Sequence, residues 1–279
     1  MRMLIVGSGV TGQATGQGFS IYGHDVVFHD IDANRLATLR KDGFNVTQSL
    51  PQAVQKSDII FVCVPTPTAN GSMDFSFIQN AIIGIGEALN QPTHYHIAVI
   101  RSTILPSATR LKVIPLLEEH SRSKVGEDFG VCMNPEFLRD ESALQDFLNP
   151  NRIVIGEFDK QSGDFLEKAY SSIKAPIIRT DLDSAEMIKY ASNLFLATKI
   201  SFFNEIYMIC KNLNIDSEVL GKVVSLDPRI GKYGVYGGRP FDGKCLPKDL
   251  EAFRSFVKSL DLNPILLDAV SSINNAFRS

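Results

Sequence analysis

Short apolar runs alternate with helix-length segments through the first 180 residues of this 279-residue chain. The runs are rich in β-branched and aliphatic residues, and they cover residues 3–6, 26–29, 59–64, 97–100, 130–132, 153–155 and 176–178. Strands separated by helices in this way are typical of a parallel sheet with helices on both faces. The alternation therefore predicts an α/β fold, with a Rossmann-type, doubly wound sheet in residues 1–180.

The pattern changes after residue 180. Asp183 and Glu186 have the spacing of a capping box, in which each residue satisfies a backbone amide of the other. They open an apolar stretch of about thirty residues without glycine or proline, which predicts one long helix. Further helices are expected at 216–224, 250–260 and 264–279, with a basic, glycine-rich loop at 227–248. Residues 181–279 are thus expected to form an all-helical domain.

Four polar residues share one side of the predicted long helix. At 100° per residue they fall within about 60° of one another on an otherwise apolar rod; they are Glu186, Lys189, Asn193 and Asn204. One interpretation is a stripe that faces solvent. We favour the other, in which an amine and an amide four residues apart line a polar cavity.

A glycine fingerprint, Gly7-Ser-Gly9-Val-Thr-Gly12, follows the first predicted strand directly and leads into a helix. In that context Gly7 makes a tight turn, Gly9 lets the backbone approach a pyrophosphate, and Gly12 allows close helix–strand packing. The pyrophosphate would lie at the helix N-terminus. A dinucleotide site is therefore expected here, with Val10 and Thr11 in its first helical turn.

The second predicted strand ends at Asp30, eighteen residues after Gly12. A carboxylate at this point can accept hydrogen bonds from both ribose hydroxyls and repels a 2′-phosphate, so the predicted cofactor is NAD rather than NADP. Asp32 lies beyond the strand end, and we expect it to cap the next helix.

Three other predicted strands end in polar motifs. These motifs are Val64-Pro-Thr66-Pro67, Arg101-Ser-Thr103 and Asn134-Pro-Glu136. Because the carboxyl ends of parallel strands meet at one edge, where ligands bind, we expect Thr66, Thr103 and Glu136 to be near neighbours.

Cys245 follows the basic loop and has Lys244 beside it and Lys248 three residues further on. Nearby ammonium groups lower the pKa of a thiol and favour the nucleophilic thiolate. A lone cysteine is usually inert, so these residues by themselves leave both interpretations open.

Composition excludes several classes of protein. The net charge is −3 and no long basic run occurs, so a nucleic-acid partner is not expected. The apolar run at the N-terminus is far too short for a signal peptide or a membrane span, which predicts a cytoplasmic protein. The four cysteines form no C-x-x-C pair, and His94 and His96 have no acidic or cysteine partner nearby in the sequence, so neither disulfides nor a metal site are expected.

Together the motifs resemble those of the UDP-glucose/GDP-mannose dehydrogenases, from Met3 to about Phe256. The resemblance adds Glu186-x-x-Lys189-x-x-x-Asn193, Asp-Pro-Arg229 and Gly-x-Cys245-x-Pro-Lys248-Asp249 to the motifs above. Members of this family oxidise C6 of a nucleotide sugar to a carboxylate in two steps with two NAD, and this activity is what the resemblance implies here.

The resemblance also implies a role for each motif residue. Cys245 would add to the aldehyde as a thiohemiacetal and then carry a thioester, while Lys189 and Asn193 hold the oxyanion. Asp249 and Thr103 would position water for Glu136 as the general base. The residues implied at the cofactor are Gly7, Gly9, Val10, Thr11, Gly12, Asp30, Val64, Pro65, Thr66, Thr103 and Lys248. Those implied at the substrate are Glu136, Phe137, Leu138, Lys189, Asn193, Arg229, Phe241 and Gly243.

Arg229 resembles the arginine that reaches a neighbouring subunit's substrate, so the resemblance also implies a homodimer built around the long helix. The chain departs from the family at Asp242, where a glycine is usual, and at Asp140-Glu141, where a glutamate follows Phe-Leu-Arg. Family members usually carry a third domain that grips the nucleotide, and this chain stops before it. We therefore expect a dimer that binds NAD normally but handles UDP-sugars poorly, or accepts a smaller phosphorylated sugar. Its phosphate contacts would come from Arg229, Lys232, Arg239 and Lys244.

Two other functions remain open at this point. A β-hydroxyacid dehydrogenase also pairs a Rossmann domain with a helical domain and uses a lysine and an asparagine four residues apart, but it performs one oxidation and needs no thiol. A catalytically silent NAD-binding protein would perform none. The number of NADH molecules formed per substrate distinguishes the three functions. The favoured function gives two, a β-hydroxyacid dehydrogenase gives one, and a silent NAD-binding protein gives none.

Overall fold

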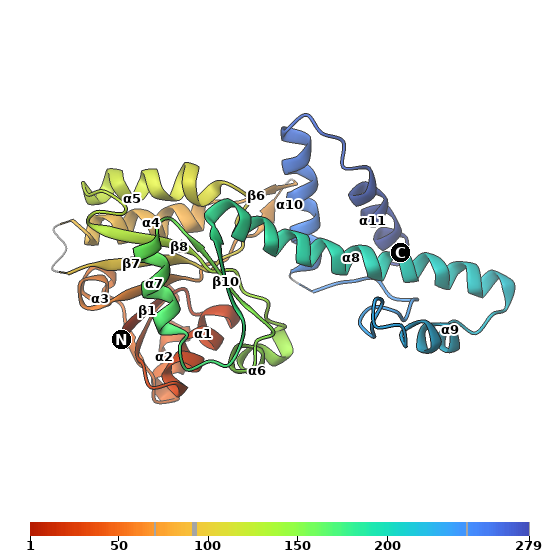
Figure 1. Cartoon of the computed structure of the whole chain (residues 1–279), viewed down its shortest axis with the longest axis horizontal. Coiled ribbons are helices and arrows are strands. Elements are labelled where there is room, and N and C mark those ends of the chain that lie inside the picture. Colours follow the sequence, from red (N-terminus) through yellow and green to blue (C-terminus); the bar gives the residue numbers. More distant parts are fainter. Residues whose placement is uncertain (70, 91–93, 244, 279) are drawn as a thin grey trace. The chain divides into compact units, whose positions relative to one another are not determined.

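The computed structural model describes residues 1–69, 71–90, 94–243 and 245–278 (Figure 1). The chain divides into two compact units. The first comprises Met1–Thr66 and Asp74–Lys189, and the second comprises Pro67–Met73 and Tyr190–Ser279. None of the helices in the described ranges combines the length and apolarity that crossing a membrane would require.

The first unit is built on an eight-stranded sheet with the order β3-β2-β1-β4-β7-β8-β9-β10. The strands are β1 (Arg2–Val6), β2 (Asp25–His29), β3 (Asn45–Thr47), β4 (Ile59–Val62), β7 (His96–Ile100), β8 (Phe129–Met133), β9 (Ile153–Glu157) and β10 (Ile177–Asp181). From β3 to β8 every pairing is parallel, and the strand order reverses between β1 and β4. The predicted doubly wound α/β fold is therefore confirmed, with its switch point between β1 and β4.

Strand direction differs from the expectation at one end of the sheet. β9 pairs antiparallel with β8 through Cys132 and Met133, and β10 then runs parallel to β9. β3, three residues long, was not expected either. An apolar run shows that a buried strand exists but carries no information on its direction, which depends on the connection. The sheet is accordingly mostly, rather than wholly, parallel.

Helices cover both faces of the sheet (Figure 1). One side carries α1 (Val10–Ile21), α2 (Ala33–Lys41), α6 (Ala143–Leu148) and α7 (Lys160–Ala169), and the other α3 (Leu50–Lys56), α4 (Ser76–Ala88) and α5 (Ile114–Ser121). Phe19 of α1 lies at the centre of the first layer, with its ring centroid 5.1 Å from that of Phe61 and 5.0 Å from those of Phe147 and Tyr170. This aromatic packing anchors α1, whose N-terminus follows the glycine fingerprint.

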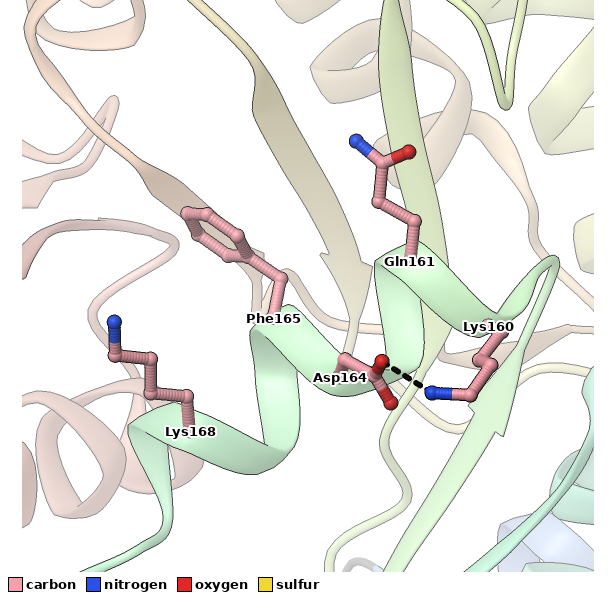
Figure 2. Close-up of a pocket in the computed structure, with 5 residues that line it drawn as sticks. All are labelled: Lys160, Gln161, Asp164, Phe165 and Lys168. Carbon is pink, nitrogen blue, oxygen red and sulfur yellow. Dashed lines mark hydrogen bonds and ion pairs between the residues drawn. The ribbon is translucent and has the colours of Figure 1, made fainter.

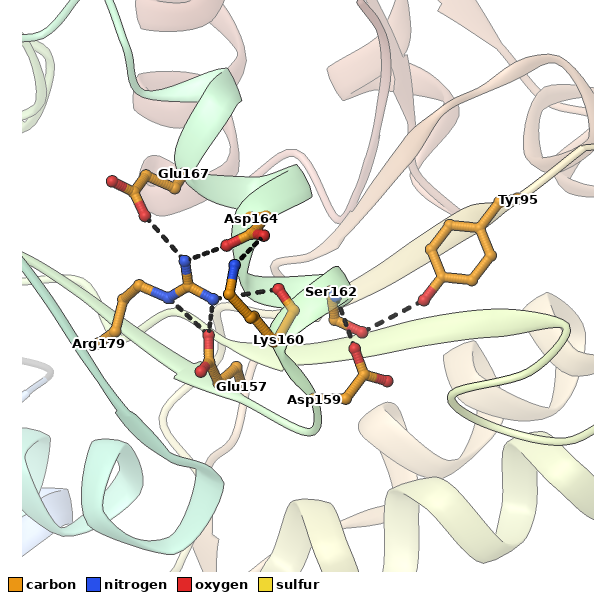
Figure 3. A network of polar contacts seen from close by, with 8 residues as sticks. All are labelled: Tyr95, Glu157, Asp159, Lys160, Ser162, Asp164, Glu167 and Arg179. Atoms are coloured by element: carbon orange, nitrogen blue, oxygen red, sulfur yellow. Dashed lines mark hydrogen bonds and ion pairs between the residues drawn. The ribbon is translucent and has the colours of Figure 1, made fainter.

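Arg179 ties the last strand to its neighbours (Figure 3). Its Nε donates to Glu157 of β9 at 2.7 Å, and its Nη1 donates to Glu167 of α7 at 3.0 Å. The same guanidinium also contacts Asp164 of α7. One arginine with three carboxylates forms a network, which fixes geometry better than an isolated surface pair does. The network therefore helps to hold β10, the strand that leads into the long helix.

The second unit contains α8 (Leu182–Leu213) beyond Lys189, α9 (Ser217–Val224), α10 (Leu246–Ser259) and α11 (Ile265–Ala276). The single long helix and the three later helices are thus present, but α10 begins at Leu246, inside the segment predicted as a loop. A hairpin of β5 (Thr68–Ala69) and β6 (Ser72–Met73) packs on α10 and was not expected. Pro247 lies in the first turn of α10, where its missing amide hydrogen costs nothing.

The predicted capping box at the start of α8 is wrong. Asp181 caps the helix instead, because its Oδ1 accepts from the Ser184 amide at 2.8 Å. Asp183 pairs with Arg110 at 2.7 Å, and Glu186 accepts from the Thr109 amide at 2.8 Å. Asp183 and Glu186 thus both make tertiary contacts with the segment at 107–110, and the spacing of residues in the sequence does not reveal such contacts.

Candidate active site

The glycine fingerprint forms a cradle at the N-terminus of α1. Gly7 has a φ of +95°, and a Cβ added there would lie 2.8 Å from the carbonyl oxygen of Cys63. Gly9 is the N-cap of α1, and the nearest heavy atom to a Cβ added there is Nη1 of Arg35 at 3.8 Å. The backbone at Gly7 is thus tightly packed against the Cys63 carbonyl group, whereas the space around Gly9, at the start of α1, is open. This arrangement fits a dinucleotide pyrophosphate, which the helix N-terminus attracts.

Asp30 lies directly after β2 and is almost fully buried. Its Oδ2 accepts from the Ser8 amide at 2.6 Å, and its Oδ1 accepts from the Asp32 amide at 2.9 Å. Asp32 caps α2 as predicted, since it accepts from the Asn34 amide at 2.9 Å. Sequence reasoning missed Arg35, whose Nη1 lies 3.7 Å from Oδ2 of Asp30. Asp30 is thus fixed at the place expected for a ribose ligand, with a half-exposed cation beside it.

We expect Asp30→Ala to change the cofactor preference. The variant loses a charge-assisted hydrogen bond to the ribose and leaves Arg35 available to a 2′-phosphate, so the ratio of NAD to NADP affinity should fall by about tenfold or more. Fluorescence titration with both cofactors measures this ratio. Arg35→Ala in the Asp30→Ala background is the control and should remove the gain for NADP. A wild type that already prefers NADP would contradict the assignment.

Glu136 and Lys189 form a buried ion pair in the first unit. Lys189 Nζ lies 2.9 Å from Glu136 Oε1, and Glu136 Oε2 accepts from the Leu138 amide at 2.6 Å. Burial raises the pKa of Glu136, but the Lys189 ammonium, the Leu138 amide and Arg101 outweigh it and hold that pKa below its usual value. Glu136 is therefore ionised at neutral pH, as a general base must be, while its proton affinity is reduced as long as Lys189 stays paired.

Arg101 joins two of the polar strand ends and was not singled out from the sequence. Its Nε donates to Thr15 of α1 at 2.7 Å, and its Nη1 donates to the side-chain oxygen of Asn134 at 2.5 Å. Asn134 in turn donates to the Val154 carbonyl at 2.7 Å. The guanidinium is buried and so links α1, β7 and the Asn134 turn. The predicted edge of polar motifs is thus assembled through Arg101 as well as through the named site residues.

The other strand-end residues are also buried at this edge. Ser102 links two of the motifs, because its hydroxyl donates to the Val64 carbonyl at 2.6 Å. Thr66 and Thr103 are each less than a tenth exposed. Phe137 stacks on a cation, with Cζ of Arg152 lying 3.8 Å from the ring centroid. The roles proposed for Thr66, Thr103 and Phe137 remain predictions.

In the second unit, Asp249 contacts two other predicted site residues, Asn193 and Lys248. It lies in the first turn of α10 and is only 1% exposed. Its Oδ2 accepts from Asn193 of α8 at 2.7 Å, and its Oδ1 accepts from Lys248 at 2.6 Å. The Lys248 carbonyl accepts from the hydroxyl of Thr68 in β5 at 3.0 Å. Both carboxylate oxygens are therefore occupied, and the cluster fixes the start of α10 against α8 and the hairpin.

Cys245 is the N-cap of α10 and differs from the other cysteines in its exposure. It is partly exposed, whereas Cys63, Cys132 and Cys210 are buried. Burial raises the pKa of Cys63 to about 12, which makes that thiol inert at neutral pH. A helix N-terminus favours a thiolate. Lys244, the flanking lysine singled out in the sequence, lies outside the described residues.

The remaining predicted residues lie in the loop before α10. Arg229 is exposed, and its Nη2 pairs with Asp227 of the same chain at 2.6 Å. Phe241 is buried, and Gly243 has a φ of +77° with open space around it. Among the described residues, no group of three or more His, Cys, Asp or Glu side chains could hold a metal ion.

An open hollow on α7 contains none of the predicted site residues (Figure 2). It is lined by Lys160, Gln161, Asp164, Phe165 and Lys168. Lys160 pairs with Asp164 across one turn of the helix, a contact drawn in Figure 2. The hollow offers one aromatic ring and helix surface, with no buried polar group, so the chemistry is expected at the polar clusters described above.

Glu186 is a buried carboxyl group on α8, three residues before Lys189. Its Oε1 accepts from the Thr109 amide, while Oε2 has no hydrogen-bond partner among the described residues. Burial raises the pKa of Glu186 to about 7, and contacts with Thr109 lessen the rise. The neutral form is therefore favoured in the folded protein well above the pH at which an exposed glutamate ionises.

We expect Glu186→Gln to stabilise the protein at alkaline pH. Because the folded pKa is the higher one, the stability that protonated Glu186 contributes is complete below about pH 4.5 and is lost as the pH rises through about 7. A glutamine cannot ionise, so the variant should exceed the wild type by up to about 3 kcal/mol at pH 8 and match it near pH 4. Urea unfolding at both pH values measures the difference. Glu205→Gln, an exposed site on the same helix, is the control. A difference that does not depend on pH would refute the assignment.

Two protein-family models cover most of the chain. Residues 41–174 match the UDP-glucose/GDP-mannose dehydrogenase family, NAD binding domain, and residues 183–276 match the central domain of the same family. Residues 2–76 also match a model described as NADP oxidoreductase coenzyme F420-dependent, which covers the glycine fingerprint. The family's NAD-binding domain indicates NAD as the cofactor, in agreement with the prediction from Asp30.

Individual relatives are similar along nearly the whole chain. GDP-mannose 6-dehydrogenase of Pseudomonas savastanoi pv. phaseolicola is 38% identical, over 99% of this chain and 70% of the relative. UDP-glucose 6-dehydrogenase AglM of Haloferax volcanii is 33% identical over the same shares. The structure of a UDP-glucose dehydrogenase from Pyrobaculum islandicum superposes with a TM-score of 0.94 at 34% identity, covering 99% of this chain and 68% of that one. The chain thus spans about 70% of the length of these relatives.

Proposed function

Because the chain belongs to the UDP-glucose/GDP-mannose dehydrogenase family, we propose that it oxidises the C6 alcohol of a nucleotide sugar to a carboxylate in two steps, through a thioester on Cys245. The observation that carries the proposal is the partly exposed Cys245 at the N-terminus of α10, one turn from the Asn193–Asp249–Lys248 cluster. A single oxidation of an alcohol has no use for a thiol, whereas the oxidation of an aldehyde to an acid has.

NAD, when bound at the glycine cradle, supplies the two-electron acceptor for each oxidation. In the first step the substrate hydroxyl loses its proton and the C6 carbon becomes an aldehyde. The charge that develops on the oxygen would be stabilised by the Lys189 ammonium and the Asn193 amide. These residues are four apart on α8 and so lie on the same side of the helix.

In the second step the thiolate of Cys245 adds to the aldehyde carbon. The new C–S bond makes a thiohemiacetal, whose oxidation leaves a thioester. Water then adds to the thioester carbonyl, the C–S bond breaks, and the products are the carboxylate and the regenerated thiol. Lys189 and Asn193 would hold the oxyanion of each tetrahedral species.

Hydrolysis needs a group that removes a proton from water. Glu136 is ionised at neutral pH and is the proposed base. Its proton affinity would rise when Lys189 turns from Glu136 to the oxyanion, so one ammonium can serve in both places in turn. Thr103 and Asp249 would orient the water.

The substrate is proposed from the relatives, which are named for GDP-mannose and for UDP-glucose. The experiment incubates the chain with NAD and GDP-mannose, UDP-glucose or a hexose 1-phosphate, and identifies the product by mass spectrometry. A nucleotide uronate supports the proposal. A hexuronate 1-phosphate would support the smaller substrate considered from the sequence, and no acid from any of the three would contradict the proposal.

A homodimer is proposed from the apolar surface of α8 and α9. Apolar side chains that are each at least half exposed recur every seven residues on α8, at Phe195, Phe202 and Ile209. Val219 and Val223 on α9 are exposed as well. A seven-residue apolar repeat is what helices use to pack against a partner helix. A second copy of the chain would cover this surface and bring its Arg229 to the other subunit.

We expect Phe202→Glu to convert the dimer into a monomer that still binds NAD. The charge would be buried at the dimer interface, whereas in the monomer it is solvated. Light scattering on the wild type and the variant measures the mass, and Lys211→Glu at an exposed site nearer the end of α8 is the control. A monomeric wild type would refute the proposed dimer.

A further inference from the structure

We propose that two buried asparagines, Asn204 of α8 and Asn274 of α11, are positioning residues that fix the loop before Cys245 and thereby tune its thiol. This role rests on the proposed function, in which Cys245 is the nucleophile. Both residues belong to the second unit, as do the loop and Cys245.

Asn204 clamps the loop at Gly238 and Arg239. Its side chain is fully buried. Nδ2 donates to the Arg239 carbonyl at 2.9 Å, and Oδ1 accepts from the Gly238 amide at 2.9 Å. The side-chain amide of Asn204 therefore forms hydrogen bonds with backbone groups of two successive residues, in a segment that has no regular secondary structure.

Asn274 clamps the same loop at Phe241. It is 3% exposed. Its Oδ1 accepts from the Phe241 amide at 2.8 Å, and its Nδ2 donates to the Phe241 carbonyl at 3.1 Å. Phe241 is also buried through its side chain and precedes Cys245 by four residues. The second clamp thus acts on a residue close to Cys245 in the sequence.

Only an amide suits both positions. Asparagine offers one acceptor and a two-hydrogen donor in a single plane, whereas an ionised aspartate offers acceptors alone. An aspartate at either site would point an oxygen at a backbone carbonyl. Each lost contact would also leave a buried backbone group without a partner, which costs about 1–3 kcal/mol.

The loop has little room to move on the side of α8. A Cβ added to Gly237 would lie 2.3 Å from the carbonyl oxygen of Phe203 and 2.5 Å from Cβ of Tyr207. The backbone of Gly237 therefore packs directly against α8, one residue before the contact with Asn204. Close packing on one side and four hydrogen bonds hold residues 237–241 in one conformation, and Cys245 follows this segment by four residues.

The test measures the reactivity of Cys245 directly. The rate of its alkylation by iodoacetamide is followed by site-resolved mass spectrometry in the wild type, Asn204→Asp and Asn274→Asp. The other three cysteines are buried, so they react little. We expect a change of about tenfold in either variant at pH 8, the equivalent of one hydrogen bond. The ratio of the alkylation rate in each variant to that in the wild type should approach one as the pH falls, because a protonated carboxyl group regains a donor.

Asn275→Asp is the matched control, since this neighbouring asparagine on α11 is exposed and should leave the rate unchanged. NAD affinity reports the integrity of the first unit and should not change in any variant. Aspartate variants that bind NAD and keep the alkylation profile of the wild type would overturn the proposal.

If an aspartate variant fails to fold, hydrogen exchange in the wild type tests the two asparagine clamps instead. Protection of the Gly238 and Phe241 amides supports the clamps, and exchange at the rate of an open loop overturns them. The alkylation result does not depend on whether Cys245 carries a thioester. A failure of the proposed function, seen as less than two NADH per substrate, is thus distinguishable from a failure of the clamps.

Discussion

Cys245→Ala is expected to abolish formation of the carboxylate while NAD affinity stays that of the wild type. A methyl group cannot form the C–S bond to the aldehyde, so no thioester is made and the second oxidation has no covalent intermediate. NAD binding should be spared because the glycine cradle belongs to the first unit and Cys245 to the second. Mass spectrometry of the products, with an aldehyde trap present, measures the outcome.

Cys210→Ala is the matched control, because Cys210 belongs to the same unit but is buried. It should leave uronate formation unchanged apart from a modest loss of stability. Four-electron turnover by Cys245→Ala would exclude covalent catalysis by this thiol.

Lys189→Met is expected to lower kcat by about 10²-fold to 10³-fold, the usual effect of losing one group that stabilises an oxyanion. Methionine fills a similar volume without the charge. The variant also leaves Glu136 buried without its ammonium, which is the strongest of the influences that lower the pKa of Glu136. That pKa should therefore rise, and the acidic limb of the kcat profile should move to higher pH.

The pH profile of kcat distinguishes a catalytic role of Lys189 from a purely structural one. Lys211→Met, at an exposed position on the same helix, should match the wild type in both kcat and profile. Since an unpaired buried charge can cost about 3–5 kcal/mol, NAD binding must be shown to persist in Lys189→Met. A folded variant with kcat within tenfold of the wild type and an unmoved acidic limb would contradict the assignment.

The sequence predicted the fold well where local pattern and structure coincide. The alternation of apolar runs gave most strands of the sheet, and the absence of glycine and proline gave α8. The antiparallel direction of β9 was missed because a short apolar run indicates a strand but not its direction. The capping box failed because Asp183 and Glu186 contact residues more than seventy positions away.

The candidate site was predicted less completely. Spacing grouped Lys189 with Asn193, but it could not show that Lys189 pairs with Glu136, which lies 53 residues away. Arg101 and Asn274 were missed because a single arginine at a strand end, or one asparagine in an amphipathic helix, has no distinctive pattern. Their importance comes from burial and from the backbone groups they satisfy, and both depend on tertiary structure.

Counting the NADH formed per nucleotide sugar consumed, at completion and with excess NAD, tests the proposed function most directly. Two oxidations through a Cys245 thioester require two NADH and one nucleotide uronate for each sugar. One NADH per sugar, with an aldehyde or ketone as the final product, would instead indicate a β-hydroxyacid-type dehydrogenase, and none would indicate a silent NAD-binding protein. Either of these results would contradict the account.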